Sequence, residues 1–331
     1  MASRRVFIGR LGAGGAGVLA SVLLAARGRE ALAGAAAAAA ETASGGALLR
    51  LDSNENPRGP CRAAVDALLA AVPSLSRYPD QPEVDLRDRL ASLHAVPPEA
   101  VLAACGSTEI LSLAVQAFTG PGRPLVRAVP SFEAPAGFAA QWGAPVVEVP
   151  LDRDLRTDLA AMAERGRGAG LLYVCNPNNP TATMRDAREV SKAYGLAGLR
   201  IGYAVSSPSI VAELARRKLP SGVNGPGAAA ALASLGDPGH LRAERSLNLE
   251  ARRFTERALA GAGLATVPSH ANFLMVDVRR DAAAFRQACR RRGVLIGRPF
   301  PPLDTFARIS IGTLDEMRRA AGVIREVLNA D

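Results

Sequence analysis

Residues that bind metals or form disulfides are scarce in this chain. It contains four Cys and three His among 331 residues, and they are scattered without a CxxC pair. A zinc site built from Cys and His is therefore not expected, and no other metal site is indicated. The cysteines are more typical of small buried hydrophobes than of disulfide bridges.

Aromatic residues are also few, at 4% of the chain. The formal net charge is +9, but the basic residues are dispersed and little aromatic interleaving accompanies them. A nucleic-acid groove needs a clustered basic surface, so no nucleic-acid partner is expected. The composition, 48% hydrophobic and 21% charged, is that of a globular protein with ample sequence for a core.

Lysine is the scarcest reactive residue. Of the 40 basic residues only Lys192 and Lys218 are lysines, and the rest are arginines, as GC-rich coding favours. Any chemistry that needs a lysine amine therefore has two candidates.

The amino terminus is predicted to be a targeting segment. Ser3-Arg4-Arg5-Val6-Phe7-Ile8 resembles a twin-arginine export signal, and a weakly apolar stretch of 16 residues follows over 11–26. Ala31-Leu32-Ala33 then offers a small-residue cleavage site. The expected partner is the twin-arginine export machinery, and the expected location is periplasmic or otherwise exported.

The same residues are compatible with two alternatives to the export signal. Gly12, Gly14 and Gly17 match GxGxxG, but this dinucleotide motif needs a preceding strand, for which the chain has no room. An uncleaved membrane anchor is the stronger rival, although the apolar stretch is shorter than the about 20 residues of a spanning helix.

Helical and strand patterns alternate along the rest of the chain, which is typical of an α/β protein with a mostly parallel sheet flanked by helices. Hydrophobic spacing predicts helices over 62–72, 83–94, 110–118, 134–141, 242–259 and 282–292. It predicts strands over 101–105, 124–129, 146–149, 170–175, 199–205, 273–278 and 307–311.

The domain boundaries follow from changes in this pattern. Residues 1–44 are the signal and an Ala-rich linker, and residues 45–75 form an N-terminal arm. Residues 76–237 form a large α/β domain, and residues 238–331 form a smaller α+β domain at the C-terminus.

Several segments match the motifs of one enzyme family, in the family's order. They run from Leu51-Asp52-Ser53-Asn54-Glu55-Asn56-Pro57 to Arg308-Ile309-Ser310-Ile311-Gly312, and the most specific is Ser191-Lys192-Ala193-Tyr194-Gly195-Leu196-Ala197-Gly198-Leu199-Arg200. In these segments the chain resembles the class I/II pyridoxal-phosphate-dependent aminotransferases of fold type I, in particular the histidinol-phosphate aminotransferase branch. The resemblance implies that residues 76–237 are the domain that binds the cofactor. The resemblance implies a pyridoxal 5'-phosphate enzyme that acts on an amino acid and a 2-oxo acid as a homodimer.

The resemblance also implies roles for individual residues. Lys192 would form the Schiff base with the cofactor aldehyde and move the substrate proton, because both steps need an amine. Arg308 would hold the substrate α-carboxylate with its planar guanidinium. The remaining residues would bind the cofactor: Gly106, Ser107, Thr108, Ser191 and Arg200 at its phosphate, Phe132 on its ring, Asn179 at its 3-oxygen, and Tyr78 at the phosphate in the partner subunit.

The chain departs from the family between Asn179 and Lys192, which are only 13 positions apart. The family's Asp-x-Ala-Tyr segment is missing there, with the Asp that keeps the pyridine nitrogen protonated, and Asp186 is a weak substitute. Thirteen residues can join the two motifs but cannot also supply a helix and two strands. The sheet is therefore predicted to lack strands beside the cofactor and to have a cleft or an unpaired edge.

The sequence is compatible with three functions. The first is an aminotransferase that acts through Lys192, with turnover weakened by the missing Asp. The second is an inactive remnant of the fold that serves as a cofactor-binding or scaffold protein. The third is a decarboxylase on the same scaffold, which would need the same lysine. The family resemblance favours the first, with histidinol phosphate as a donor by analogy only.

Overall fold

The computed structural model describes residues 48–184 and 194–330. The predicted signal segment, Asp186, Ser191 and Lys192 lie outside the described residues. Every element below belongs to the compact unit Arg50–Asp331, except that strand β1 (Leu49–Leu51) begins one residue before this unit. No helix among the described residues is long and apolar enough to cross a membrane, and those residues contain no cluster that could hold a metal ion.

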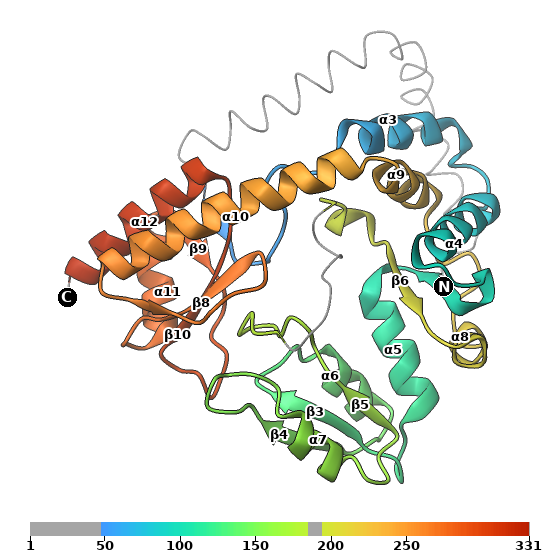
Figure 1. Ribbon diagram of the computed structural model, residues 1–331, viewed down its shortest axis with the longest axis horizontal. Coiled ribbons are helices and arrows are strands. Elements are labelled where there is room, and N and C mark those ends of the chain that lie inside the picture. Colours follow the sequence, from blue (N-terminus) through green and yellow to red (C-terminus); the bar gives the residue numbers. More distant parts are fainter. Residues whose placement is uncertain (1–47, 185–193, 331) are drawn as a thin grey trace, which may run out of the picture. The chain divides into compact units, whose positions relative to one another are not determined.

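The strands of the predicted large domain form two sheets rather than one (Figure 1). In the first, β2 (Val101–Ala104) pairs antiparallel with β6 (Gly202–Val205). In the second, β3 (Leu125–Val129) lies between β4 (Val146–Pro150) and β5 (Leu171–Tyr173), and both pairings are parallel. Among the described strands, β5 and β6 each have one neighbour only. The expected shortage of strands is confirmed, because the short link from Asn179 to Lys192 cannot supply them.

Helix α5 (Gly106–Phe118) packs against elements of both sheets. Its residues Leu113 and Ala117 lie in one buried cluster with Leu102 of β2. Val115 lies in another with Leu125 of β3 and with Ala139 of α6 (Ala134–Gln141). Burying a Leu or Val side chain contributes about 1.5–3 kcal/mol, so α5 holds the two sheets together. Its first residues are the predicted phosphate-binding ones.

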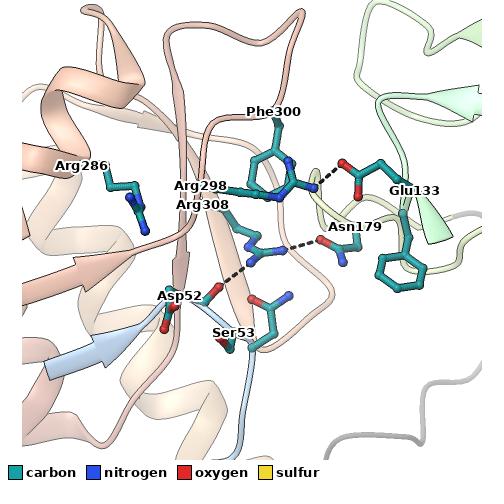
Figure 2. A pocket seen from close by; sticks show the side chains of 10 residues that line it. Asp52, Ser53, Glu133, Asn179, Arg286, Arg298, Phe300 and Arg308 are labelled. Carbon is teal, nitrogen blue, oxygen red and sulfur yellow. Dashed lines mark hydrogen bonds and ion pairs between the residues drawn. The ribbon is translucent and has the colours of Figure 1, made fainter. Parts of the chain in front are cut away.

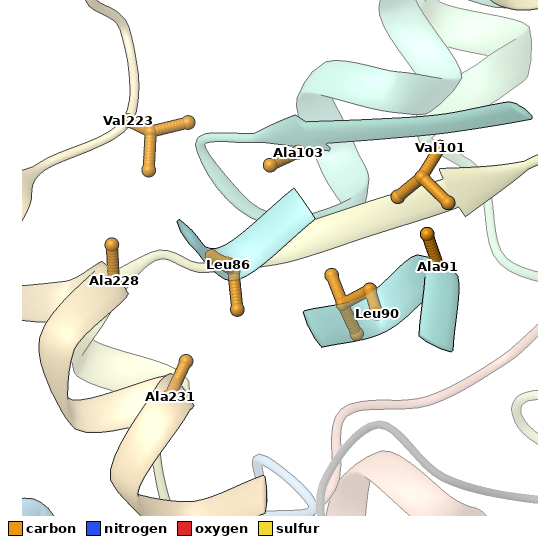
Figure 3. Close-up of a cluster of buried hydrophobic side chains, with 8 residues drawn as sticks. All are labelled: Leu86, Leu90, Ala91, Val101, Ala103, Val223, Ala228 and Ala231. Carbon is orange, nitrogen blue, oxygen red and sulfur yellow. The ribbon is translucent and has the colours of Figure 1, made fainter. Parts of the chain in front are cut away.

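Alanine makes up half of the buried core cluster on the other face of β2. Figure 3 shows this cluster, which joins α4 (Asp80–His94), β2 and α9 (Gly225–Leu235) through Leu86, Leu90, Ala91, Val101, Ala103, Val223, Ala228 and Ala231. Helix α3 (Arg62–Ala71) packs beside α9 through Cys61, Ala64 and Ala230. Helices α7 (Leu159–Arg165) and α8 (Pro208–Ala215) and the short 3-10 helices η3 (Val72–Ser74), η4 (Pro98–Ala100) and η5 (Ala197–Leu199) complete this part.

Residues after Pro238 build a second α+β layer. Strands β10 (Phe306–Ser310), β8 (Phe273–Asp277) and β7 (Ala265–Thr266) form an antiparallel sheet. Helices α10 (Pro238–Gly261), α11 (Ala282–Arg291) and α12 (Leu314–Asn329) pack beside it, with α10 and α12 next to each other (Figure 1). Strand β9 (Val294–Ile296) pairs with β1 (Leu49–Leu51), so the segment that follows β1 is held beside this layer.

Candidate active site

The start of α5 forms a cradle for an anion. Gly106 has a φ of +77°, and a Cβ atom there would overlap Nη2 of Arg200. A Cβ atom at Gly202 would likewise overlap the backbone nitrogen of Ser107. Only glycine permits these close approaches. The structure thus brings together Gly106, Ser107 and Arg200, with Thr108 in the same helical turn.

The chemistry of this cradle suits a phosphate group. The backbone N–H groups of a helix N-terminus and the helix dipole both favour an anion. The residue before the helix, Cys105, makes no side-chain capping hydrogen bond. Arg200 adds a forked cation that can bind two phosphate oxygens at once. The residues present therefore fit the phosphate of the cofactor that the family resemblance implies.

A second group of predicted residues lines a cavity of about 460 Å³ (Figure 2). Phe132, Asn179 and Arg308 meet there from three distant parts of the sequence. The other lining residues were not predicted to belong to the site, and they are Asp52, Ser53, Asn54, Glu133, Arg286, Arg298 and Phe300. Two signals could have found part of this set, namely the motif after Leu51 and the Arg298-Pro299-Phe300 run ten residues before Arg308.

Arg308 is the central cation of this cavity, and its side chain is only 8% exposed. Its Nη1 donates to Oδ1 of Asn179 at 2.7 Å, and its Nη2 donates to the carbonyl of Asp52 at 2.5 Å. Its Nε is buried without a hydrogen-bond partner, and its guanidinium lies 4.8 Å from the ring centre of Phe300.

The environment of Arg308 disfavours its positive charge. Burial, together with the charge of Arg298, lowers the pKa of Arg308 to about 10, although the carboxylates of Asp52 and Glu133 oppose the shift. An anion would strongly stabilise a buried cation that contacts only neutral oxygens. The free-energy cost of removing the guanidinium from water is already incurred when the protein folds. Arg308 is therefore suited to bind an anionic group of a substrate.

A buried polar network fixes the turn that carries Asn179. The side-chain nitrogen of Asn178 donates to the carbonyl of Pro130 at 3.0 Å and to Oγ1 of Thr181 at 2.8 Å. Thr181 in turn bonds to Thr183 at 2.8 Å. Because Pro130 begins the loop of Phe132, this network sets the position of Asn179 relative to Phe132. Sequence reasoning missed these residues, although buried polar groups need partners.

The remaining predicted residues are placed differently. Tyr78 is 84% exposed and is not among the residues that line the cavity. Ser191 and Lys192 lie outside the described residues. The other lysine, Lys218, is 9% exposed at its side chain and is ion-paired with Glu83, so its amine is already engaged.

The fold resembles that of solved pyridoxal-phosphate enzymes. The crystal structure of histidinol-phosphate aminotransferase from Sinorhizobium meliloti, in complex with pyridoxal-5'-phosphate, matches with a TM-score of 0.80 at 27% identity. The match covers 86% of this chain and 91% of that one. The fold and the anion cradle together define a pyridoxal-phosphate-dependent enzyme of fold type I.

Sequence relatives identify the family of this chain within the pyridoxal-phosphate-dependent enzymes. The model of the family "Aminotransferase class I and II" matches residues 47–190 and 187–324. A histidinol-phosphate aminotransferase of Symbiobacterium thermophilum is 36% identical, over 85% of this chain and 91% of its own length. An aromatic amino acid aminotransferase of Rhodococcus jostii is 34% identical, over 80% of this chain and 86% of its own length. The chain belongs to the class I and II aminotransferases.

The same comparisons mark the site of the missing segment. The family model matches in two pieces that meet at residues 187–190. The alignment with the Symbiobacterium relative is 329 positions long but includes only 85% of this 331-residue chain. Many residues of that relative therefore have no counterpart in this chain. The chain is a pyridoxal-phosphate-dependent aminotransferase, and these findings give no support to the inactive-scaffold alternative.

Proposed function

We propose that this aminotransferase takes its amino group from histidinol phosphate and passes it to a 2-oxo acid. The observation that carries the proposal is the buried guanidinium of Arg308, which contacts two neutral oxygens and keeps an unpartnered Nε in the cavity. Such a cation suits an anionic substrate group. Relatives that carry the name histidinol-phosphate aminotransferase support the phosphorylated donor.

The cofactor would be held by residues from several parts of the chain. Its phosphate would lie at Gly106, Ser107, Thr108, Ser191 and Arg200, its ring against Phe132, and its 3-oxygen near Asn179. When bound, pyridoxal phosphate would withdraw electrons from the carbon that carries the amino group, less strongly than where an Asp keeps its ring nitrogen protonated. Lys192 supplies the amine that holds the cofactor covalently, and its Nζ then takes the proton from that carbon and returns it.

The described residues support this assignment of roles. Lys218 is engaged by Glu83, which leaves Lys192 as the lysine for the reaction. Arg308 would fix the anionic group of the substrate and so aim the bond that loses its proton, as precise positioning lowers the barrier.

The donor is tested by comparing histidinol phosphate with histidinol. We expect kcat/KM to be about 10- to 10²-fold higher for the phosphate, because a charge-assisted hydrogen-bonded contact contributes about 1.5–3 kcal/mol. The measurement is steady-state amino transfer to 2-oxoglutarate by the purified chain loaded with cofactor. Equal kcat/KM values for the two donors would contradict the proposed donor.

We also propose a homodimer in which Tyr78 reaches the cofactor phosphate of the partner subunit. Its 84% exposed phenol ring supports this proposal, because large aromatic side chains at such exposure are common at interfaces.

Mixing two inactive variants tests this arrangement. In a mixture of Tyr78→Ala and Lys192→Ala chains, each hybrid dimer would contain one site with both residues intact. Random mixing should therefore restore about a quarter of the normal sites, measured by activity after the chains are unfolded and refolded together. Trp142→Ala, at another exposed aromatic, serves as the control. Recovery no greater than the sum of the separate variants would show that Tyr78 does not cross.

The third proposal is export through the twin-arginine route. It rests on Arg4-Arg5, the apolar stretch over 11–26 and the small residues at 31–33. Changing both Arg4 and Arg5 to Lys keeps the charge but should block export, so the protein should remain in the cytoplasmic fraction. Cell fractionation with immunoblotting measures this. Unchanged periplasmic delivery of the double variant would exclude the route.

A further inference from the structure

The segment that follows β1 is attached to β10 at two successive points. At the first point the carbonyl oxygen of Asp52 accepts a hydrogen bond from Nη2 of Arg308 (Figure 2). At the second point Asn54 bonds to Ser310. The two residues of each pair are 256 positions apart, so the segment and the strand are joined in the same order along the chain. Arg308 and Ser310 share one face of β10, because side chains alternate along a strand.

Asn54 is held through its side chain and through both of its backbone groups. Its backbone N–H donates to Oγ of Ser310 at 2.8 Å, and this hydroxyl donates to Oδ1 of Asn54 at 3.0 Å. The carbonyl oxygen of Asn54 accepts from Nδ2 of Asn272, just before β8, at 2.8 Å. Asn54 is 2% exposed and Ser310 is 4% exposed. These bonds are therefore shielded from water, which makes the loss of one partner costly.

The backbone of Asn54 is in the left-handed region, with a φ of +55°. Asparagine adopts this conformation more readily than most residues that have a side chain. Glycine would adopt it with less strain, but it could not accept the hydrogen bond from Ser310. The side-chain bond to β10 thus accounts for asparagine at this position, which the backbone conformation alone would leave to glycine.

The group of Asp52 that holds Arg308 is its backbone carbonyl. The charge of the Asp52 carboxylate opposes the lowering of the pKa of Arg308, but no described hydrogen bond joins the two side chains. The Oδ1 atom of this carboxylate is buried without a hydrogen-bond partner and lies 3.7 Å from Nε of Arg50. A backbone carbonyl is only as fixed as its own segment, and the next attachment of that segment to β10 is Asn54.

We infer that Asn54 is a positioning residue for anion binding. Through its hydrogen bonds to Ser310 it holds the carbonyl of Asp52 against Arg308, and in this way it orients the guanidinium toward the anionic group of the substrate. The inference rests on the proposed function, in which Arg308 holds that group. A planar guanidinium binds two oxygens at once only in the correct orientation, so loss of this attachment should weaken anion binding.

Replacing Asn54 with Gly tests this role, because glycine removes the side chain without straining the backbone. The probe is inorganic phosphate, titrated calorimetrically into the cofactor-loaded protein. We expect Asn54→Gly to raise the Kd of phosphate by about 5- to 10-fold, as the loss of one buried hydrogen bond would. Ser310→Ala removes the same attachment from the other side and should have the same effect. Ala95→Gly, at an exposed residue with a φ of +52°, is the matched control and should bind phosphate as the wild type does.

A second background shows whether Asn54 acts through Arg308. Arg308→Lys keeps a cation but has no planar fork to orient, so adding Asn54→Gly to it should raise the Kd of phosphate by less than about 2-fold. Asn54 also lines the cavity, and a direct contact with the ligand would instead give the same loss in both backgrounds. That result, or wild-type affinity in both Asn54→Gly and Ser310→Ala, would overturn the inference.

Failure of the proposed function has a different signature, because the titration needs no turnover. If histidinol phosphate is not a donor while Arg308→Met loses phosphate affinity, only the proposed function is contradicted. If Arg308→Met binds phosphate as tightly as the wild type, the proposed function and this inference are both overturned.

Discussion

Replacing Lys192 with Ala is expected to abolish both the covalent attachment of pyridoxal phosphate and amino transfer. The lysine supplies the only amine proposed to react with the cofactor aldehyde, and it also moves the substrate proton. Loss of the proton transfer alone should lower kcat by about 10²–10⁴-fold. Borohydride reduction of the cofactor-loaded wild type, followed by peptide mapping, should place the label on the peptide that contains Lys192.

The chain offers an unusually clean control for this experiment. Lys218 is the other lysine, and its amine is ion-paired with Glu83 in a largely buried position. Lys218→Arg keeps that charge pair and removes the amine, so it should preserve folding, labelling and activity. Lys218→Ala is a poorer control, because it would leave the Glu83 carboxylate without its partner. Label on the Lys218 peptide, or amino transfer by Lys192→Ala at the wild-type rate, would contradict the assignment.

The sequence predicted the residues proposed to contact the cofactor and the substrate better than it predicted the other residues that line the cavity. Phe132, Asn179 and Arg308 meet in one cavity, and Gly106, Ser107 and Arg200 meet at the start of α5, as the family resemblance implies. Arg286 and Arg298 could not be found in the same way. In the sequence, Arg286 is an ordinary polar position beside Phe285 on an amphipathic helix, and only the folded chain shows that α11 packs against β9 and β10 at the cavity.

The secondary structure was predicted where hydrophobic periodicity is strong. The helix over 134–141 agrees with α6, and the helix over 242–259 lies inside α10. Helix α9 was missed because its sequence, GPGAAAALASL, has almost no polar residues. It therefore lacks the alternation of apolar and polar faces by which a helix is predicted. Helix α12 was missed although Thr313 and Glu316 form a capping box at its start, a signal that the sequence contains.

The shortage of strands in the large domain was predictable from the family resemblance together with the chain length, whereas the division into two sheets was not predicted. The span between Asn179 and Lys192 is too short for the missing strands, and β5 and β6 accordingly lack a second neighbour among the described strands. The antiparallel pairing of β2 with β6 was not predictable. The two strands are about a hundred residues apart in the sequence, and hydrophobic periodicity does not indicate the direction in which strands pair.

Replacing Arg308 with Met is expected to reduce activity strongly while changing stability little. The variant loses a charge-assisted contact to the substrate anion, so kcat/KM should fall by about 10²-fold. The free energy of unfolding should change by only about 1 kcal/mol, because removing a buried charge relieves its desolvation penalty and offsets the hydrogen bonds lost at Asn179 and Asp52. Thermal unfolding and steady-state kinetics on the same preparation measure the two effects.

The pH dependence of the wild type provides an independent check on Arg308. Its pKa is lowered to about 10, mainly by burial, and only the protonated guanidinium attracts an anion. Binding of an anionic substrate should therefore weaken as the pH rises through about 10, which KM should report as an increase. Arg308→Lys, whose amine has an ordinary pKa of about 10.4 that burial lowers further, should show the increase at a lower pH. A KM that stays constant up to pH 11 in the wild type, or an Arg308→Met variant that keeps wild-type kcat/KM, would show that another group holds the substrate anion.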